Sequence, residues 1–423
     1  MSSVSLGPLP AECLFDQALH ITVHGLKPGQ QISLRALSAG VPATVLASQA
    51  LFQASAAGEV DLTRDAPLSG SYAGVDPMGL FWSRSPQPAS QVRCSVPVAD
   101  DAMTLTLVAE NEGVVLTTHA IRRRYCDDSV TTREVREDGL VGRLFVPRAS
   151  GRHPTVLVVG GSGGGLRWSG EMAALLASHG YATLALAYFG VDGLPPTLDR
   201  IPLEYFERAI DWLARQGEVD GDRIAVCGAS RGGELALLLG ATFPTLRAVV
   251  AYVPSGIVWP AYPPSGHSAW TLKGKDVAHA DVMPLADWNL AVAQGRVDPD
   301  SFDWYLLPLQ DADVVEAAGI RVENIQGPVL LISGQADGIW PSTALTAFAL
   351  ARFRQQGFSH PVEHLCYADA GHHLGWPHVS TLSTRFQHPV SGEAQDLGGT
   401  PMGTARARED SWRRLLAFLR EHL

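Results

Sequence analysis

A serine between glycines is the residue of this sequence whose setting points most directly to chemistry. The stretch AVCGASRGGELAL, residues 225 to 237, places Ser230 in the pattern G-x-S-x-G. An apolar, strand-like run precedes this pattern and a helix-like run follows it. Such a context is typical of the nucleophile elbow of α/β-hydrolases, in which the serine occupies a sharp strand-to-helix turn. We therefore predict that Ser230 is a nucleophile; a purely structural turn is the alternative.

A serine hydroxyl attacks a carbonyl carbon only if a base removes its proton. In this class of hydrolase an acid and a histidine follow the serine in the order Ser, Asp or Glu, His. Asp337 follows the strand-like GPVLLISG, and His372 and His373 follow the strand-like VEHLCYAD. We predict that Asp337 orients His372, which takes the Ser230 proton. His373 competes for the role of base, and Asp369 for that of acid.

The oxyanion formed by such an attack needs two backbone N–H donors. We expect the first from Arg231, the residue after the nucleophile. The second is expected from the glycine run GGSGGG at residues 160–165, with Gly161 and Ser162 both open as the donor. A phosphate-cradling nucleotide loop is the alternative. However, the run does not fit the G-x-G-x-x-G spacing and no acidic residue ends the next strand.

The pattern of the chain changes near residue 140, which predicts two domains. Up to residue 120, short alternating segments punctuated by Gly, Pro and Asp indicate antiparallel strands in a β-sandwich. From residue 153, apolar runs alternate with helical stretches, which is typical of a mostly parallel α/β sheet. We predict a sandwich domain at 1–135 and an α/β-hydrolase domain at 136–423. Residues 254–325, rich in Pro, Trp and Asp, are expected to be an irregular insert and a candidate cap.

Composition narrows the classes of function. A formal net charge of −11 argues against nucleic-acid binding, which needs a basic surface. The five cysteines are dispersed without a C-x-x-C pair, so neither a disulfide framework nor a zinc site is expected: Cys13, Cys94, Cys126, Cys227 and Cys366. No basic and then apolar start suggests a secretory signal, and no apolar run is long enough to cross a bilayer. We expect a cytoplasmic enzyme with no metal and no cofactor.

Several long motifs, in order, resemble the acyl-CoA thioesterase and bile acid-CoA:amino acid N-acyltransferase family over essentially the whole chain. They include HGLKPGQQISLRA, SYAGVDPMGLFWS, GGSGGG, CGASRGGELAL, YADAGHHLGWP and GGTPMGTARAREDSW. The resemblance implies an immunoglobulin-like sandwich followed by an α/β-hydrolase domain. It also implies a triad on Ser230, Asp337 and His372, and an acyl-enzyme formed from a small-molecule acyl thioester.

One departure bears on the acceptor of the acyl group. The N-acyltransferase branch is associated with cysteine at the elbow, whereas this chain has Ser230. An oxygen ester is less readily attacked by an amine than a thioester is, so we expect hydrolysis by water. Transfer to an amino acid, amine or hydroxyl acceptor, a carboxylesterase and a non-catalytic binding module are the alternatives. If the carrier is coenzyme A, its phosphates call for arginines near the site; the candidates are Arg122, Arg123, Arg124, Arg167 and Arg231.

Overall fold

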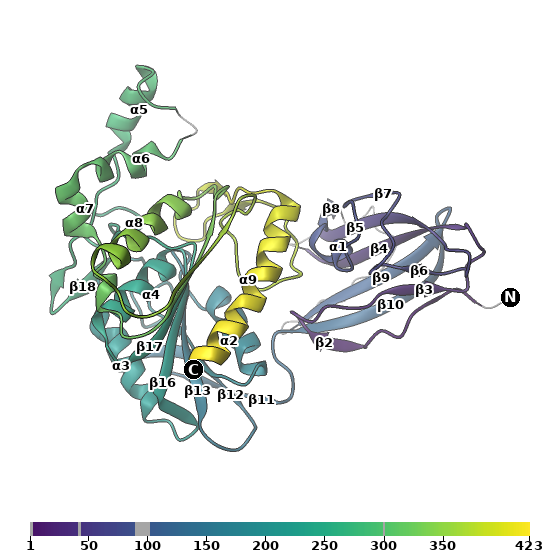
Figure 1. Ribbon diagram of the computed structural model, residues 1–423, viewed down its shortest axis with the longest axis horizontal. Coiled ribbons are helices and arrows are strands. Elements are labelled where there is room, and N and C mark those ends of the chain that lie inside the picture. The colour runs from purple at the N-terminus through teal and green to yellow at the C-terminus, as the bar shows by residue number, and fades with distance from the viewer. Residues whose placement is uncertain (1–2, 41–43, 89–101, 299–300) are drawn as a thin grey trace. The chain divides into compact units, whose positions relative to one another are not determined.

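The computed structural model describes residues 3–40, 44–88, 102–298 and 301–423. The chain divides into two compact units, each with its own core (Figure 1). The first unit comprises Met1–Asp127, Trp376–Thr384 and Thr400–Glu409, and the second comprises Asp128–Gly375, Arg385–Gly399 and Asp410–Leu423. Cys94 lies outside the described residues, and the other four cysteines are free thiols.

Two sheets form the first unit and enclose one hydrophobic core. The smaller has the order β1-β3-β6, and the larger the order β2-β10-β9-β4-β5-β7, with β8 also paired to β5. Alternate residues of β4, such as Ile32 and Leu34, enter the core that Val23 and Val60 of the other sheet share. The β-sandwich is thus confirmed. Its elements are β1 (Ser5–Leu6), β2 (Glu12–Leu14), β3 (Thr22–His24), β4 (Gln31–Ala39), β5 (Thr44–Gln53), β6 (Val60–Asp61), β7 (Ser69–Gly70), α1 (Gly79–Trp82), β8 (Ser85–Pro88), β9 (Ala102–Asn111) and β10 (Val114–Arg124).

Two late segments of the chain complete the first unit. The sequence assigns residues 376–384 and 400–409 to the hydrolase domain, whereas in the structure they pack with the sandwich. Thr381 N donates to Trp82 O at 2.9 Å, and Thr381 Oγ1 donates to Pro401 O at 2.8 Å. The contact with Trp82 joins residues about 300 positions apart, so no local pattern in the sequence marks it.

An eight-stranded sheet, in the order β11-β12-β14-β13-β16-β17-β20-β21, is the centre of the second unit. The first two strands pair antiparallel with their neighbours, and the other strands run parallel. Every residue of β14 and β20 is buried, because helices cover both faces. The mostly parallel α/β fold is therefore confirmed. The strands are β11 (Val130–Val135), β12 (Val141–Pro147), β13 (His153–Val159), β14 (Ala182–Ala187), β16 (Val219–Ala229), β17 (Leu246–Tyr252), β20 (Val329–Gly334) and β21 (Val362–Tyr367).

The helices lie on both sides of this sheet. Figure 1 shows α3 (Leu203–Ala214) and α4 (Arg231–Thr242) on one side, and α2 (Arg167–Ser178) and α9 (Pro401–His422) on the other. The apolar spacing of α3 explains its docking, because Leu203, Phe206, Ile210 and Leu213 form one buried stripe. At the carboxyl edge of the parallel strands, four loops carry the predicted site residues, which is where α/β sheets gather catalytic groups.

The insert at residues 254–325 has more regular structure than its sequence predicts. Within its described residues, short strands come first and short helices follow them, and α5 and α6 extend away from the sheet (Figure 1). A separate small core is built from Ile257, Trp259, Leu309, Trp340 and Leu345. The expectation of an irregular stretch is therefore wrong for these elements. The remaining elements of the second unit are β15 (Ile201–Pro202), β18 (Trp270–Leu272), β19 (Lys275–Asp276), α5 (Leu285–Ala293), α6 (Asp303–Leu306), η2 (Pro308–Gln310), α7 (Ala312–Ala318), η3 (Val322–Asn324), α8 (Ser342–Gln355), β22 (Arg385–Gln387) and β23 (Ala394–Asp396).

Candidate active site

Ser230 occupies a sharp turn between the end of β16 and the first residue of α4. Its backbone has φ 59° and ψ −124°, a conformation that non-glycine residues rarely adopt. The turn is fixed by hydrogen bonds: Ser230 N donates to Tyr252 O at 2.9 Å, and Ser230 O accepts from Gly233 N at 2.8 Å. This is the backbone geometry of a nucleophile elbow, which exposes the serine hydroxyl at the edge of the sheet.

The glycines around Ser230 are required by crowding of the main chain. A Cβ added at Gly228 would lie 1.9 Å from Gly232 O, and one added at Gly232 would lie 2.2 Å from Gly160 O. Neither clash can be relieved by a side-chain movement, since both partners are backbone atoms. The G-x-S-x-G pattern therefore reports real steric limits at this turn.

Asp337 and His372 form a buried pair. His372 Nδ1 lies 2.9 Å from Asp337 Oδ1 and 2.8 Å from Oδ2, and the Asp337 side chain is 1% exposed. Asp337 Oδ1 also accepts from the N–H groups of Ile339 and Trp340, at 2.9 and 3.3 Å. An ionised carboxylate only accepts hydrogen bonds, so the imidazole proton lies on Nδ1 and Nε2 is left as the basic nitrogen. The competing candidates His373 and Asp369 are exposed.

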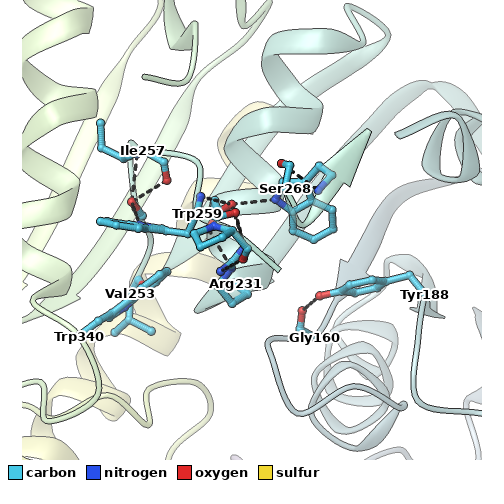
Figure 2. A network of polar contacts seen from close by, with 12 residues as sticks. Gly160, Tyr188, Arg231, Val253, Ile257, Trp259, Ser268 and Trp340 are labelled. Atoms are coloured by element: carbon cyan, nitrogen blue, oxygen red, sulfur yellow. Dashed lines mark hydrogen bonds and ion pairs between the residues drawn. The ribbon is translucent and has the colours of Figure 1, made fainter. Parts of the chain in front are cut away.

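The end of β17 links this pair to Ser230. Ser230 N donates to Tyr252 O, and the next residue, Val253, accepts from Trp340 Nε1 at 3.0 Å (Figure 2). The Trp340 and His372 rings are 6.2 Å apart in an edge-to-face arrangement. Within the described residues no hydrogen bond joins Ser230 Oγ to His372 Nε2. The structure thus brings Asp337 and His372 together, and attaches both to the strand end that holds Ser230.

The glycine loop at residues 160–165 approaches Ser230 closely. A Cβ added at Gly161 would lie 3.1 Å from Ser230 Cβ and 3.6 Å from Ser230 Oγ. The loop is shaped by a turn in which Gly164 N donates to Gly161 O at 3.2 Å. Tyr188 donates its hydroxyl to Gly160 O at 2.6 Å (Figure 2).

Three backbone N–H groups near Ser230 are available to a ligand. In the part of the chain that the structure describes, the N–H groups of Gly161 and Ser162 donate to no other residue. The N–H of Arg231 is the first of α4 and has no acceptor within its own helix. These N–H groups can bind the negatively charged oxygen that forms when Ser230 Oγ bonds to a carbonyl carbon.

A buried ion pair that the sequence analysis missed follows Ser230 directly. Arg231 Nε lies 3.0 Å from Glu234 Oε2, and the two side chains are 10% and 0% exposed. Arg231 also donates to the carbonyl oxygens of Trp259 and Pro260, both at 2.9 Å (Figure 2). Trp270 Nε1 donates to Glu234 Oε1 at 2.7 Å. Burial raises the pKa of Glu234, while the nearby Arg231 acts in the opposite direction. Glu234 is the one carboxylate in the apolar run GELALLLG, and this unusual position is the sequence feature that could have indicated a buried charge.

This network corrects part of the expectation about phosphate-binding arginines. The Arg231 guanidinium already binds Glu234 and two carbonyl groups of the insert, and Arg123 is fully buried, so neither is placed to bind a phosphate in solvent. Arg122 and Arg124 pair with Glu12 at 3.0 and 2.6 Å. Arg167, at the start of α2, has a side chain that is 95% exposed.

The site belongs to an α/β-hydrolase with a serine elbow, and comparisons with known proteins define its family. Residues 16–137 match the acyl-CoA thioester hydrolase/BAAT N-terminal region, and residues 201–423 match the BAAT/acyl-CoA thioester hydrolase C-terminal family. The chain therefore belongs to the acyl-CoA thioester hydrolase/BAAT family of enzymes, which confirms the resemblance carried by its motifs.

Relatives of this family align along nearly the whole chain. Human acyl-coenzyme A thioesterase 1 is 31% identical over 97% of this chain and 94% of its own length. Mouse peroxisomal succinyl-coenzyme A thioesterase is 29% identical over 100% of this chain and 97% of its own length. Among solved structures, a dienelactone hydrolase-like promiscuous phosphotriesterase from metagenomic libraries is 20% identical, with a TM-score of 0.41 over 70% of this chain and 99% of its own.

The close approach of Gly161 to Ser230 predicts the effect of one methyl group. Gly161→Ala would place its Cβ 3.0 Å from Ala229 O, so the loop must move away from the nucleophile. We expect labelling of Ser230 by a fluorophosphonate to slow by about 10- to 100-fold, since small misplacements of this kind are costly. Gly170→Ala is the matched control, because a Cβ there meets nothing within 4 Å. Equal labelling rates for the two variants would contradict the prediction.

Removal of the buried carboxylate should destabilise the protein. Glu234→Gln leaves the Arg231 charge buried without its counter-ion, so we expect the free energy of unfolding to fall by about 3 kcal/mol or more. Urea unfolding followed by circular dichroism measures this change. As a control, Glu134→Gln breaks an exposed pair with Arg143 and should change stability by less than about 1 kcal/mol. Similar losses for both variants would show that the buried pair has no special role.

Proposed function

We propose that this enzyme hydrolyses acyl-CoA thioesters through an acyl-enzyme on Ser230, with His372 as the base and Asp337 as its orienting acid. The observation that carries the proposal is the buried Asp337–His372 pair, attached to the strand end that holds the Ser230 elbow, in a chain of the acyl-CoA thioester hydrolase/BAAT family. Oxygen esters, the substrates of a carboxylesterase, are the alternative substrates of the same chemistry.

The first half of the reaction forms the acyl-enzyme. His372 Nε2 takes the Ser230 proton as Oγ attacks the thioester carbonyl carbon, while Asp337 stabilises the resulting imidazolium. The C–S bond then breaks, and the imidazolium returns the proton to the departing sulfur, which releases coenzyme A as its thiol. We expect the hydrogen bond between Ser230 Oγ and His372 Nε2 to form when substrate is bound, because catalytic hydrogen bonds commonly tighten only in that complex.

The second half releases the acid. Water, deprotonated by His372 Nε2, attacks the ester carbon, and Ser230 recovers its proton when the ester bond breaks. In both halves the oxyanion would accept hydrogen bonds from the Arg231 N–H and from the N–H of Gly161 or Ser162. The close approach of Gly161 to Ser230 Cβ supports Gly161 for this role.

Water is the proposed acceptor because the intermediate is an oxygen ester. The nearest cysteine in sequence, Cys227, is fully buried on β16, and burial raises the pKa of its thiol. It therefore offers no thiolate that would form a more reactive thioester intermediate. Transfer to an amino acid, amine or hydroxyl acceptor is the alternative outcome of the same acyl-enzyme.

The cytoplasm is the proposed location, on the strength of the free cysteines and the dispersed cysteine pattern. Relatives named peroxisomal and mitochondrial show that the family occupies more than one compartment. None of the helices described has the length and apolar character of a membrane span. Nor do the described residues gather three or more metal-ligating side chains at one point.

Single replacements in the triad should reduce turnover unequally. We expect Ser230→Ala and His372→Ala each to lower kcat by about 10⁴-fold or more, and Asp337→Asn by somewhat less. The combined loss should be no greater than the single losses, because the three groups act as one unit. Thiol release from a panel of acyl-CoAs measures the rates. Turnover of Ser230→Ala equal to that of the wild type on every chain length would refute the proposal.

The acceptor can be read from the products. With an acyl-CoA substrate and glycine, taurine or an alcohol present, we expect mass spectrometry to find mostly free acid, because the Ser230 ester reacts poorly with amines. The ratio of free acid to conjugate is the measurement, with Ser230→Ala as the blank. A conjugate in excess of the free acid would favour the acyltransferase.

A further inference from the structure

The loop beside Ser230 is held by a hairpin that lies far away in the sequence. Ser162 Oγ lies 3.0 Å from Nε2 of His388, which follows β22 and begins the turn to β23. The next residue of the turn, Pro389, faces the next residue of the loop, because a Cβ added at Gly163 would lie 3.3 Å from Pro389 Cγ. Two consecutive residues of the hairpin thus contact two consecutive residues of the glycine loop.

The surroundings of His388 determine which ring nitrogen carries the proton. Nδ1 lies 3.2 Å from Val390 N and 3.3 Å from Ser391 N. Backbone N–H groups only donate, so Nδ1 accepts from both and carries no proton. Burial lowers the pKa of His388, and the nearby Glu393 has a smaller effect in the opposite direction. The lowered pKa keeps the ring neutral near pH 7. A neutral imidazole has one N–H, so Nε2 donates to Ser162 Oγ.

The His388 ring is also fixed in place by packing. The residue is 3% exposed, and the Tyr262 ring meets it edge-to-face with centroids 4.9 Å apart. The Tyr262 hydroxyl donates to Ser391 Oγ at 2.9 Å, within the same turn. His388 N also donates to Glu393 O at 2.8 Å, and this hydrogen bond closes the turn that carries the ring. His388 is therefore a rigid donor.

A hydroxyl that accepts from His388 still has its own proton to donate. None of the described residues accepts the Ser162 proton. Ser162 follows Gly161, which borders Ser230 Oγ. We propose that Ser162 Oγ–H donates to the carbonyl oxygen of the substrate bound at Ser230, and that His388 is the residue that positions it.

This role rests on the proposed function and adds a side-chain donor to the backbone N–H groups. A hydroxyl that accepts a hydrogen bond becomes a stronger donor, because hydrogen bonds in a chain polarise one another. Its donation is most valuable when the carbonyl oxygen gains full negative charge. Its loss should therefore lower kcat and leave KM nearly unchanged.

The test compares Ser162→Ala, His388→Ala, the double variant and His388→Gln. We expect the first two each to lower kcat for an acyl-CoA by about 10- to 100-fold, with KM within about 3-fold of the wild type. The double variant should be no slower than the slower single variant, since the two residues serve one hydrogen bond. His388→Gln keeps an N–H donor at the same reach and should recover most of the rate.

His364→Ala is the matched control. His364 Nε2 makes the same type of contact, at 2.8 Å to Ser333 Oγ, on strands β20 and β21. The His364→Ala variant should leave kcat within about 3-fold of the wild type, because β17 separates β20 and β21 from β16, the strand that ends at Ser230. A wild-type kcat for Ser162→Ala, or losses that multiply in the double variant, would overturn the proposal.

Fluorophosphonate labelling of Ser230 separates this inference from the proposed function. Labelling also develops negative charge on an oxygen beside Ser230, whichever substrate is natural. If the wild type labels but releases no thiol from acyl-CoAs, the thioesterase proposal fails while the labelling rates still decide the role of Ser162. Slower labelling of Ser162→Ala and His388→Ala, restored in His388→Gln, supports that role; equal rates refute it.

Discussion

The unfavourable backbone of Ser230 is the constraint on which the rest of the site depends. A non-glycine residue at φ 59° costs about 1–3 kcal/mol and persists only where the surrounding structure fixes it. Here Ser230 N–H donates to the last residue of β17, and Ser230 O accepts from the first turn of α4. Gly228 and Gly232 let the neighbouring main chain lie closer than any Cβ would allow. The same packing that maintains the turn brings the glycine loop against the serine, so one crowded junction sets both the position of the hydroxyl and the N–H groups around it.

The Arg231–Glu234 pair extends this junction into the insert. Both residues lie in the first turn of the elbow helix, yet their side chains bind Trp259, Pro260 and Trp270 of the insert. Isolated charges would be expensive to bury, and here each charge is compensated by the other and by backbone or indole groups. The insert is thus attached at the start of α4, and a chain of aromatic contacts continues from it to His372: Tyr305 contacts Trp259 and Trp340, and Trp340 contacts His372.

The parts of the site that the sequence predicts are those with local causes. Ser230, Asp337 and His372 each follow a parallel strand, at the sheet edge where catalytic groups collect in such folds, and the small residues around Ser230 reflect the crowding of its turn. Contacts between segments that are far apart in the sequence leave no local pattern from which they could be predicted. Ser162 and His388 are 226 residues apart, and residues 376–384 join the sandwich through hydrogen bonds to a chain about 300 residues earlier. Glu234 is an unusual residue in an apolar helix, but apart from Arg231 its partners lie in the insert, where short elements broken by turns carry no clear periodicity.

The hairpin β22–β23 shows why such distant contacts matter to the chemistry. Just after β23, Leu397 O accepts from His372 N at 2.7 Å and from Gly338 N at 3.1 Å, so a single carbonyl group holds the loops of His372 and Asp337. Gly398 then packs so closely that a Cβ added at Gly371 would lie 2.2 Å from its oxygen. At its other end the hairpin holds the glycine loop through His388. A segment without any catalytic motif therefore fixes three loops of the site relative to one another. Because hydrogen bonds and steric contact set these positions, and not the identity of exposed side chains, the hairpin organises the site whatever acyl group the enzyme accepts.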